Sequence, residues 1–282
     1  MELSKRIIPK LDIKGENLVK GVNLEGLRVL GKPETFASNY YNNGADELIF
    51  QDIISSLYGI KTLEKVIKKT ASEIFIPLTV GGGIKTTKDI YNLLRCGADK
   101  VSINSAAIND PNLVKEAIKL FGSSTIVSSI ETQFIDNNYF AFTENGRNKS
   151  DKELITWIKE IQDLGIGEII ITFIDSEGTG KGIDLKLVEL ITKSVSVPII
   201  LNGGIGNKNH VFELLSIDKI AGLAISSMFH YDNIINNKID NEDYPLGNID
   251  FLLNSKSNSK FETINIIQLK KFLLSKKIEV NL

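Results

Sequence analysis

The sequence predicts a single α/β domain over residues 1–282, a closed (β/α)8 TIM barrel with a two-fold half-barrel repeat. Eight apolar strand-like runs alternate with eight helical patterns, which is typical of βαβ units and a parallel sheet. Two of the runs end in glycine-rich turns, and several residues of the first half recur in the second half. Eight units in strict alternation favour a closed barrel over an open doubly wound sheet.

The expected strands are short runs rich in Ile and Val, as buried parallel strands are. They are Arg6–Ile13, Glu47–Ile53, Ile76–Val80, Lys100–Ile103, Thr125–Glu131, Glu168–Ile174, Pro198–Leu201 and Gly222–Ile225. The expected helices are Pro33–Asn43, Thr62–Ala71, Thr87–Leu94, Pro111–Leu120, Lys152–Leu164, Leu185–Ser194, Lys208–Leu215 and Ile264–Leu274. In this fold the chemistry takes place where the strands end.

Three stretches exceed a minimal barrel. The glycine-punctuated segment Lys14–Lys32 follows the first strand, where long loops often act as lids. Thr132–Ser150 contains alternating polar and aromatic residues, and we expect a small hairpin there. Residues 234–261, between the eighth strand and the last helix, are rich in Asn, Ser, Asp and Lys and predict a mobile surface insertion.

The internal repeat pairs functional-looking residues of the two halves. The pairs are Asp12 with Glu131 (131 − 12 = 119), Asp52 with Asp175 (175 − 52 = 123), Gly82-Gly83 with Gly203-Gly204 (203 − 82 = 121) and Asn104 with Ser226 (226 − 104 = 122). Four coincidences indicate two similar halves of four βα units each, whose related positions lie across the barrel mouth from each other.

The amino-acid composition limits the kinds of partner and the cellular compartment that we expect for this protein. A hydrophobic content of 42% with 24% charged residues is ordinary for a soluble protein with a sizeable core. The net charge of −2 gives no general attraction to nucleic acid or anionic membrane, so recognition of phosphate must be local. The single Cys96 excludes an internal disulfide framework and fits a cytoplasmic protein, and neither a signal peptide nor a membrane-spanning run is expected.

Asp12 and Glu131 are the strongest catalytic candidates. Each carboxylate closes an apolar strand, and the two positions are related by the repeat. Such a pair can act as general acid and general base on opposite sides of one substrate. Strand-end carboxylates also cap helices or bind lysine, and the repeat is what favours catalysis. Asp52 and Asp175 are weaker candidates because such acids are often structural supports.

Two half-sites for phosphate follow from the glycine turns. Their backbone N–H groups can hold an anion, and a site in each half indicates a ligand with a phosphate at each end. The half-sites comprise Gly82, Gly83, Asn104 and Ser105 in the first half, and Gly203, Gly204, Ser226 and Ser227 in the second. The segment 175–184 adds N–H donors and Thr179 beside the second half-site.

At the opposite end of the barrel the sequence places charged residues before the strands. Four charged residues stand directly before strands, so that their side chains could meet as a ring: Arg6, Glu47, Lys100 and Glu168. By spacing alone, a structural salt-bridge cluster is the preferred interpretation. His210 and His230 have no further ligands at metal-site spacing, so no metal and no cofactor is expected.

Over about residues 4–230 the chain resembles the cyclase subunits (HisF) of imidazole glycerol phosphate synthase. The motifs are Arg-Ile-Ile-Pro-x-Leu-Asp-Ile, Leu-Val-Lys-Gly-Val-Asn-Leu-Glu-Gly-Leu-Arg, Gly-Ala-Asp-Glu-Leu, Ile-Pro-Leu-Thr-Val-Gly-Gly-Gly-Ile, Gly-Ala-Asp-Lys-Val-Ser-Ile-Asn-Ser-Ala-Ala and Glu-Gly-Thr-Gly-Lys-Gly. The resemblance implies a duplicated half-barrel that accepts ammonia from a glutaminase (HisH-like) partner in a heterodimer. It implies conversion of a bis-phosphorylated formimino-aminoimidazole carboxamide nucleotide to imidazole glycerol phosphate and aminoimidazole carboxamide ribotide, for histidine biosynthesis.

The resemblance also implies roles for residues at matching positions. Catalysis falls to Asp12, Glu131 and Lys20, and the family's charged gate for ammonia falls on Arg6, Glu47, Lys100 and Glu168, with Asp99 facing the partner. Substrate and phosphate binding falls to Gly82, Gly83, Asn104, Thr172, Glu177, Gly178, Gly203, Gly204, Ser226 and Ser227.

Four positions depart from the family pattern. Glu131 and Glu177 replace aspartates, Lys10 replaces a usual cysteine and Asn202 replaces a serine. A carboxylate moved by one methylene can cost on the order of 10²-fold in rate. The cation of Lys10 is expected to lower the pKa of a neighbouring carboxylate and to weaken it as a base. Two hypotheses therefore stand. The chain is a cyclase with Asp12 as general acid and Glu131 as general base, or it is a paralogue that relays ammonia for amidination of a nucleotide sugar or surface polysaccharide precursor.

Overall fold

The computed structural model describes residues 4–54, 61–236 and 260–282, and its centre is a closed barrel of eight parallel strands. In barrel order these are β1 (Arg6–Lys14), β4 (Leu48–Asp52), β5 (Leu78–Gly81), β6 (Lys100–Ile103), β7 (Ile126–Ile135), β10 (Glu168–Phe173), β11 (Ile199–Asn202) and β12 (Ile220–Ile225). The pairing of β10 with β7 and of β12 with β1 closes the ring. The predicted (β/α)8 barrel is confirmed.

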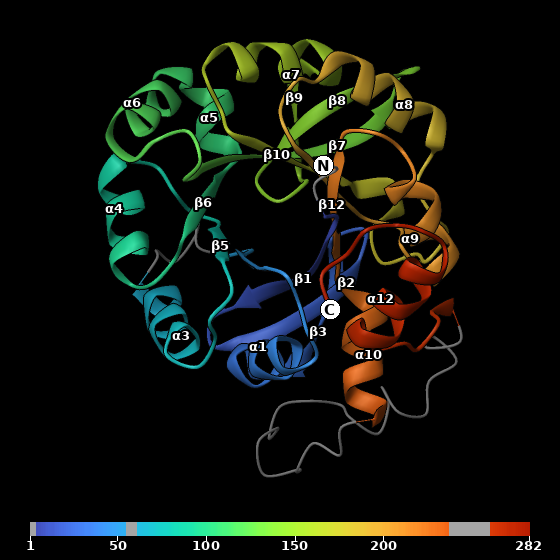
Figure 1. The fold of residues 1–282 in the computed structure, drawn as a ribbon. Helices are drawn as coiled ribbons and strands as arrows, with labels where there is room; N and C mark the ends of the chain where they lie inside the picture. Colours follow the sequence, from blue (N-terminus) through green and yellow to red (C-terminus); the bar gives the residue numbers. More distant parts are fainter. Residues whose placement is uncertain (1–3, 55–60, 237–259) are drawn as a thin grey trace.

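Helices surround the barrel as an outer ring (Figure 1). The eight predicted helices correspond to α1 (Pro33–Asn42), α3 (Lys61–Ala71), α4 (Thr87–Arg95), α6 (Pro111–Phe121), α7 (Leu154–Asp163), α8 (Leu185–Ser194), α9 (Lys208–Leu215) and α12 (Ile266–Ser275). Local signals fix several starts: Thr86 and Asp89 form a capping box at α4, and the Asp110 side chain caps α6, in which Pro111 is the first residue. The sequence prediction missed η1 (Ile174–Ser176) and two helices, α5 (Ser105–Asn109) and α10 (Ser227–Asn236).

Two hairpins extend the barrel at its mouth. The segment predicted as a long lid loop forms β2 (Asn17–Val22) and β3 (Glu25–Gly31), joined through Asn23 and Leu24 at positive φ. The hairpin predicted within 132–150 is confirmed. It consists of the extended β7 and β8 (Asn138–Thr143), and β9 (Asn148–Glu153) adds a third strand, which delays the start of α7 to Leu154.

The predicted polar insertion lies mainly at residues 237–259, outside the described residues. The prediction was wrong for the first three positions of the insertion. Residues 234–236 form the end of α10, where Ile234 is buried against the core. In the described part of the chain, no helix has both the length and the hydropathy to cross a membrane.

Repeated Gly-Ala-Asp turns fix the lower ends of the strands. After α1 and α4, Gly44 and Gly97 take positive φ, a conformation that glycine adopts without strain. The aspartate two residues on then accepts a backbone N–H of the neighbouring strand: Asp46 from Ile7, and Asp99 from Leu78, each at 2.8 Å. These contacts set the strand register at the bottom of the barrel.

Asp46 also binds the last helix. Lys270 on α12 is 2% exposed and donates to Asp46 at 2.7 Å and to the Gly44 carbonyl at 2.6 Å. The segment before β1 contacts the C-terminal segment as well, because the Lys5 backbone N–H donates to the Glu279 carbonyl at 2.8 Å.

We predict that Lys270→Met destabilises the fold by about 3 kcal/mol, because it leaves the Asp46 carboxylate largely buried without its cation. Urea unfolding measures this loss as a lower midpoint. Lys271→Met is the matched control, since Lys271 is the exposed next residue of the same helix. Equal midpoints for the two variants would mean that the buried pair contributes nothing.

Candidate active site

Alternate residues of each barrel strand point into the interior, so the interior is built in levels. On β1 the inward residues from bottom to mouth are Arg6, Ile8, Lys10 and Asp12. Above the bottom level lies an apolar cluster of one residue from each of six strands, Ile8, Ile49, Val127, Ile170, Ile200 and Ala224. On β1 the polar side chains of Lys10 and Asp12 follow above this cluster. The interior therefore separates a charged lower end from a charged mouth.

Asp12 is buried at the mouth and paired with a cation. Lys10 Nζ lies 2.6 Å from Asp12 Oδ1. Burial raises the pKa of Asp12, but the ammonium groups of Lys10 and Lys20 outweigh it, and the pKa of Asp12 lies below its usual range. Asp12 therefore carries its negative charge at neutral pH.

Lys20 joins the hairpin β2–β3 to the barrel. It lies buried in β2 and forms an ion pair with Glu177, in the segment after η1. The backbone N–H of Asn23 donates to the Glu177 carbonyl at 2.8 Å, and a Cβ on Gly178 would overlap the Gly21 carbonyl oxygen. The hairpin is thus fastened over one side of the mouth, and two predicted site residues, Lys20 and Glu177, contact each other.

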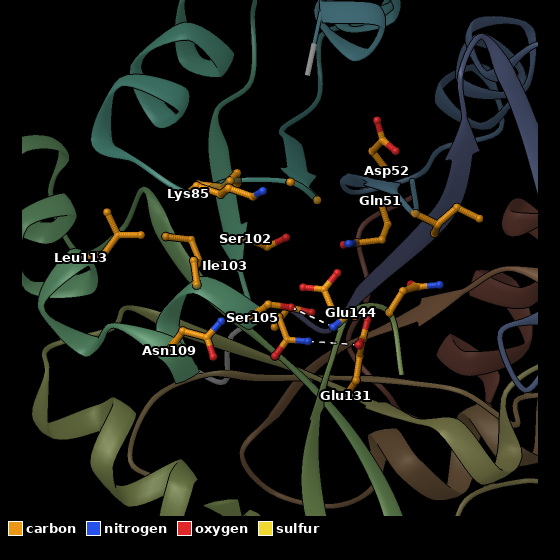
Figure 2. A pocket seen from close by; sticks show the side chains of 18 of the residues that line it. Gln51, Asp52, Lys85, Ser102, Ile103, Ser105, Asn109, Leu113, Glu131 and Glu144 are labelled. Atoms are coloured by element: carbon orange, nitrogen blue, oxygen red, sulfur yellow. Dashed lines mark hydrogen bonds between the residues drawn. The ribbon is translucent and has the colours of Figure 1, made fainter. Parts of the chain in front are cut away.

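Glu131 ends its barrel segment on β7 in a less charged setting (Figure 2). Asn104 donates to its Oε2 at 3.1 Å and to the Phe142 carbonyl at 3.0 Å. Burial raises the pKa of Glu131 to about 7, with Lys10 and the Gly146 backbone opposing the rise and the charges of Asp12 and Glu144 adding to it. At neutral pH a substantial fraction of Glu131 therefore holds a proton.

The two carboxyl groups differ in pKa in the direction that separates an acid from a base. Asp12 is ionised and able to accept a proton, although its lowered pKa makes it a weaker base, and Glu131, partly protonated, has a proton to donate. This order of the two pKa values favours the opposite assignment from the one expected from the sequence, in which Asp12 is the general acid and Glu131 the general base. The expected effect of Lys10 on its neighbour is confirmed, since Lys10 helps to lower the pKa of Asp12.

A cavity of about 270 Å³ opens beside Glu131, as Figure 2 shows. All four members of the first predicted phosphate half-site line it: Gly82, Gly83, Asn104 and Ser105. Gly82 has φ +107°, and a Cβ there would overlap the Asp52 carbonyl oxygen, so the turn needs glycine. The contacts of Asn104 differ from the expected phosphate contact, because its amide N–H groups donate to Glu131 and to the Phe142 carbonyl on β8. Its Oδ1 has no hydrogen-bond partner among the described residues.

The second half-site is a much smaller space of about 10 Å³, lined by Glu177, Gly178, Asn202, Gly203, Gly204, Ser226 and Ser227. The glycine turns of the two halves match: φ is +107° and +67° at Gly82 and Gly83, and +105° and +75° at Gly203 and Gly204. The backbone geometry thus repeats between the halves. A space of this size holds about one water molecule.

Ser226 and Asn202, two polar residues that line the second half-site, already form hydrogen bonds to the barrel. The Ser226 hydroxyl donates to the Lys10 carbonyl at 2.9 Å. Thr172 donates to Asn202, which donates to the Ala224 carbonyl at 2.9 Å. These side chains hold the strand ends together, and Ser227 also lines the space.

The four charged residues at the bottom do meet in a ring. Arg6 pairs with Glu47 at 2.8 Å and with Glu168. Lys100 closes the ring by pairing with the same two glutamates at 3.0 and 3.1 Å. Thr79 adds a hydrogen bond to Glu47 at 2.6 Å. Asp99, beside Lys100, is exposed on this face.

The structure adds site residues that the sequence prediction missed. Gln51 lies two residues beyond Ile49 on β4, and strand periodicity places it inward and on the cavity wall. Glu144 and Asn145 reach the cavity from the turn between β8 and β9, and Ser105 accepts the Glu144 backbone N–H at 3.0 Å (Figure 2). The Asn-Gly pair at 145–146 is the signal that marks this turn in the sequence.

Other expected residues play supporting parts. Asp52 accepts the backbone N–H of Ile54, and Asp175 accepts that of Phe134, each at 2.9 Å. Buried His230 binds the Tyr40 hydroxyl at 2.6 Å, and burial with the charge of Lys20 lowers its pKa to about 3, so it is neutral. Among the residues that the structure describes, no group of three or more His, Cys, Asp or Glu side chains is placed to hold a metal ion.

Comparisons with known proteins agree with this geometry. A family model described as "Histidine biosynthesis protein" matches residues 6–235. The chain is 47% identical over 230 residues to the "Imidazole glycerol phosphate synthase subunit HisF" of Bacillus cereus (strain AH187), a match that covers 81% of this chain and 91% of the relative. The HisF subunits of strains Q1 and ATCC 10987 match over the same shares at 47% and 46% identity.

Proposed function

The chain belongs to the histidine biosynthesis protein family, among its HisF members, and from this premise we propose that it is the cyclase subunit of imidazole glycerol phosphate synthase. The reaction converts a bis-phosphorylated formimino-aminoimidazole carboxamide nucleotide and ammonia to imidazole glycerol phosphate, aminoimidazole carboxamide ribotide and water, which carries away the ketone oxygen that the ammonia nitrogen replaces. The relatives compared are all named as HisF subunits, so amidination of a nucleotide sugar is not favoured.

One observation carries the proposal: matching glycine turns on the two barrel halves, with Asp12 and Glu131 between them. A ligand with two phosphates would use one turn at each end, and its reacting centre would then lie over the barrel axis. The attacking nitrogen must lose protons, and the departing amino nitrogen must gain one. Asp12 is suited to the first step and Glu131 to the second, because their pKa values differ in that direction.

Lys20 and Glu177 complete the proposed site. Their buried ion pair holds the hairpin β2–β3 at the second half-site. Because that space is small, we propose that substrate binding shifts the hairpin and frees Lys20 to meet the incoming phosphate or the developing charge. At the two positions where glutamate replaces the family's aspartate, Glu131 and Glu177 still supply a carboxylate to the proposed site.

We further propose a glutaminase partner at the bottom of the barrel. Ammonia released there would enter between Arg6, Glu47, Lys100 and Glu168 and pass the apolar cluster towards Asp12. Phe75, which is 82% exposed in the turn before β5 and contacts Tyr41, offers an apolar anchor beside the ring. Exposed Asp99 adds charge to the same face.

The direct experiment supplies the purified chain with the bis-phosphorylated nucleotide and an ammonium salt, and measures imidazole glycerol phosphate. Turnover is the expected result. A protein that binds a glutaminase but gives no turnover would remove the cyclase proposal and return the nucleotide-sugar alternative, which the same assay tests with a nucleotide-sugar acceptor.

We predict that Lys100→Met uncouples the two subunits. Lys100 holds both glutamates of the ring, and without it their carboxylates repel each other and the entrance changes shape. With a glutaminase and glutamine, cyclase turnover should fall about 10-fold, while turnover with added ammonium stays within about 2-fold. The control is Lys119→Met, an exposed lysine at the end of α6. Equal losses with glutamine and with ammonium would contradict a gate.

A further inference from the structure

Lys10 is a buried charge that the proposed acid–base pair does not itself require. It is 5% exposed, on the inner face of β1, in the polar level directly below Asp12. An ammonium group is removed from water only where carboxylates compensate it. Its closest partner is Asp12, two residues further on the same strand face, at 2.6 Å.

The charges around this pair nearly balance. Lys10 faces Asp12, Glu177 and Glu131, and its pKa is raised, because burial lowers it but these carboxylates raise it more. Asp12 in turn faces Lys10, Lys20 and the neutral His230. Glu131 faces Asp12, Lys10 and Glu144. Two lysines therefore compensate Asp12 and Glu177 when Glu131 keeps its proton.

The backbone at Lys10 is also held in place. Ser226, directly before α10, donates its hydroxyl to the Lys10 carbonyl at 2.9 Å. Lys10 is therefore anchored through its carbonyl to the second half-site and through its ammonium to Asp12. Its side chain has little freedom to leave the carboxylate, because the surrounding interior is closed.

Building on the proposed cyclase function, we propose that Lys10 is a positioning residue: its ammonium group holds the Asp12 carboxylate ionised and aimed at the substrate. The two carboxyl groups then have different roles in proton transfer. Asp12 stays ready to accept a proton, and the proton of the network resides on Glu131. Lys10 itself is not the reacting group, since its nitrogen remains protonated in the pair.

The test compares Lys10→Met and Lys10→Arg with wild type in the ammonium-driven cyclase assay from about pH 6 to pH 9. The ratio of variant to wild-type kcat/KM at each pH cancels the titration of ammonia itself. Without the cation the pKa of Asp12 rises by 1–3 units, a general range for lost charge partners, so the Lys10→Met ratio should fall towards low pH, by about 5-fold between pH 8.5 and pH 6 at the upper end of that range. Lys10→Arg keeps the charge, and its ratio should stay flat.

Lys14→Met is the control, because Lys14 is the exposed last residue of the same strand. A Lys10→Met ratio that is constant across pH means that Lys10 is only structural, and it overturns the inference. If Lys10→Met does not fold, Lys10→Arg decides: a flat ratio within about 3-fold of wild type supports the inference, and a ratio that falls towards low pH overturns it. Wild-type protein without turnover overturns the cyclase proposal and this inference together, whereas active wild type with a flat Lys10→Met ratio overturns only the inference.

Discussion

Asp12→Asn is expected to lower the kcat of the ammonium-driven cyclase reaction by about 10³-fold. Asparagine keeps the size of the side chain and an oxygen that accepts from Lys10, but it cannot take a proton. Asp12 is the carboxylate whose pKa Lys10 and Lys20 lower, and Lys10 holds it at 2.6 Å on the inner face of β1. Steady-state formation of imidazole glycerol phosphate measures the loss.

A matched control is available in η1, directly after the end of another barrel strand, β10. Asp175→Asn also removes one carboxylate near the mouth, yet Asp175 only accepts the Phe134 backbone N–H, which an asparagine oxygen can accept as well. Its turnover should stay within about 3-fold of wild type. If Asp12→Asn kept wild-type turnover with unchanged folding, Asp12 would not be the base.

Glu131→Gln is expected to cost about 10²-fold in kcat and to change the pH profile. The glutamine amide can keep the contact with Asn104 but has no proton to give. Since the pKa of Glu131 is about 7 and the acid form is the active one, wild-type kcat/KM at a fixed concentration of unprotonated ammonia should fall as pH rises above 7. The variant should lack this fall.

Glu131→Asp provides the comparison, because it keeps the acid and shortens the side chain by one methylene. We expect it to retain the alkaline fall at a reduced rate. A wild-type profile that instead rises through pH 7 at fixed unprotonated ammonia would assign the base role to Glu131, as the sequence alone had suggested.

The barrel could be predicted because its eight strands are short apolar runs separated by helical patterns. The β7–β8 hairpin could also be predicted from the sequence. Asp136 and Asn137 form its turn with positive φ, and polar and aromatic residues are interspersed in the strands on either side. The β2–β3 hairpin was not, because its turn at Asn23 and Leu24 lacks the usual Asn-Gly signal and glycines interrupt the strands. Tertiary contact with Glu177 helps to hold that turn.

The candidate site was predictable in position and less so in detail. Strand-end residues and glycine turns follow from the repeat, and they lie at the mouth as expected. The partners of Asn104 and Ser226 did not follow, because these contacts join residues 27 and 216 positions apart. The order of the two carboxyl pKa values depends on burial and on three-dimensional charge placement, which the spacing of residues does not contain.

The ring of Arg6, Glu47, Lys100 and Glu168 illustrates the same limit. Its members were predictable because each stands directly before a strand, and the structure brings all four together. A salt-bridge cluster that only closes the core and a gate for ammonia share this geometry. The glutamine-driven and ammonium-driven rates of Lys100→Met separate the two roles.

A crystal structure of the chain with its bis-phosphorylated nucleotide tests the central claim most directly. We predict one phosphate on the Gly82-Gly83 turn, the other on the Gly203-Gly204 turn beside Ser227, and the reacting imidazole centre between Asp12 and Glu131. Both phosphates on one half of the barrel, or a ligand that contacts neither carboxyl group, would contradict the account.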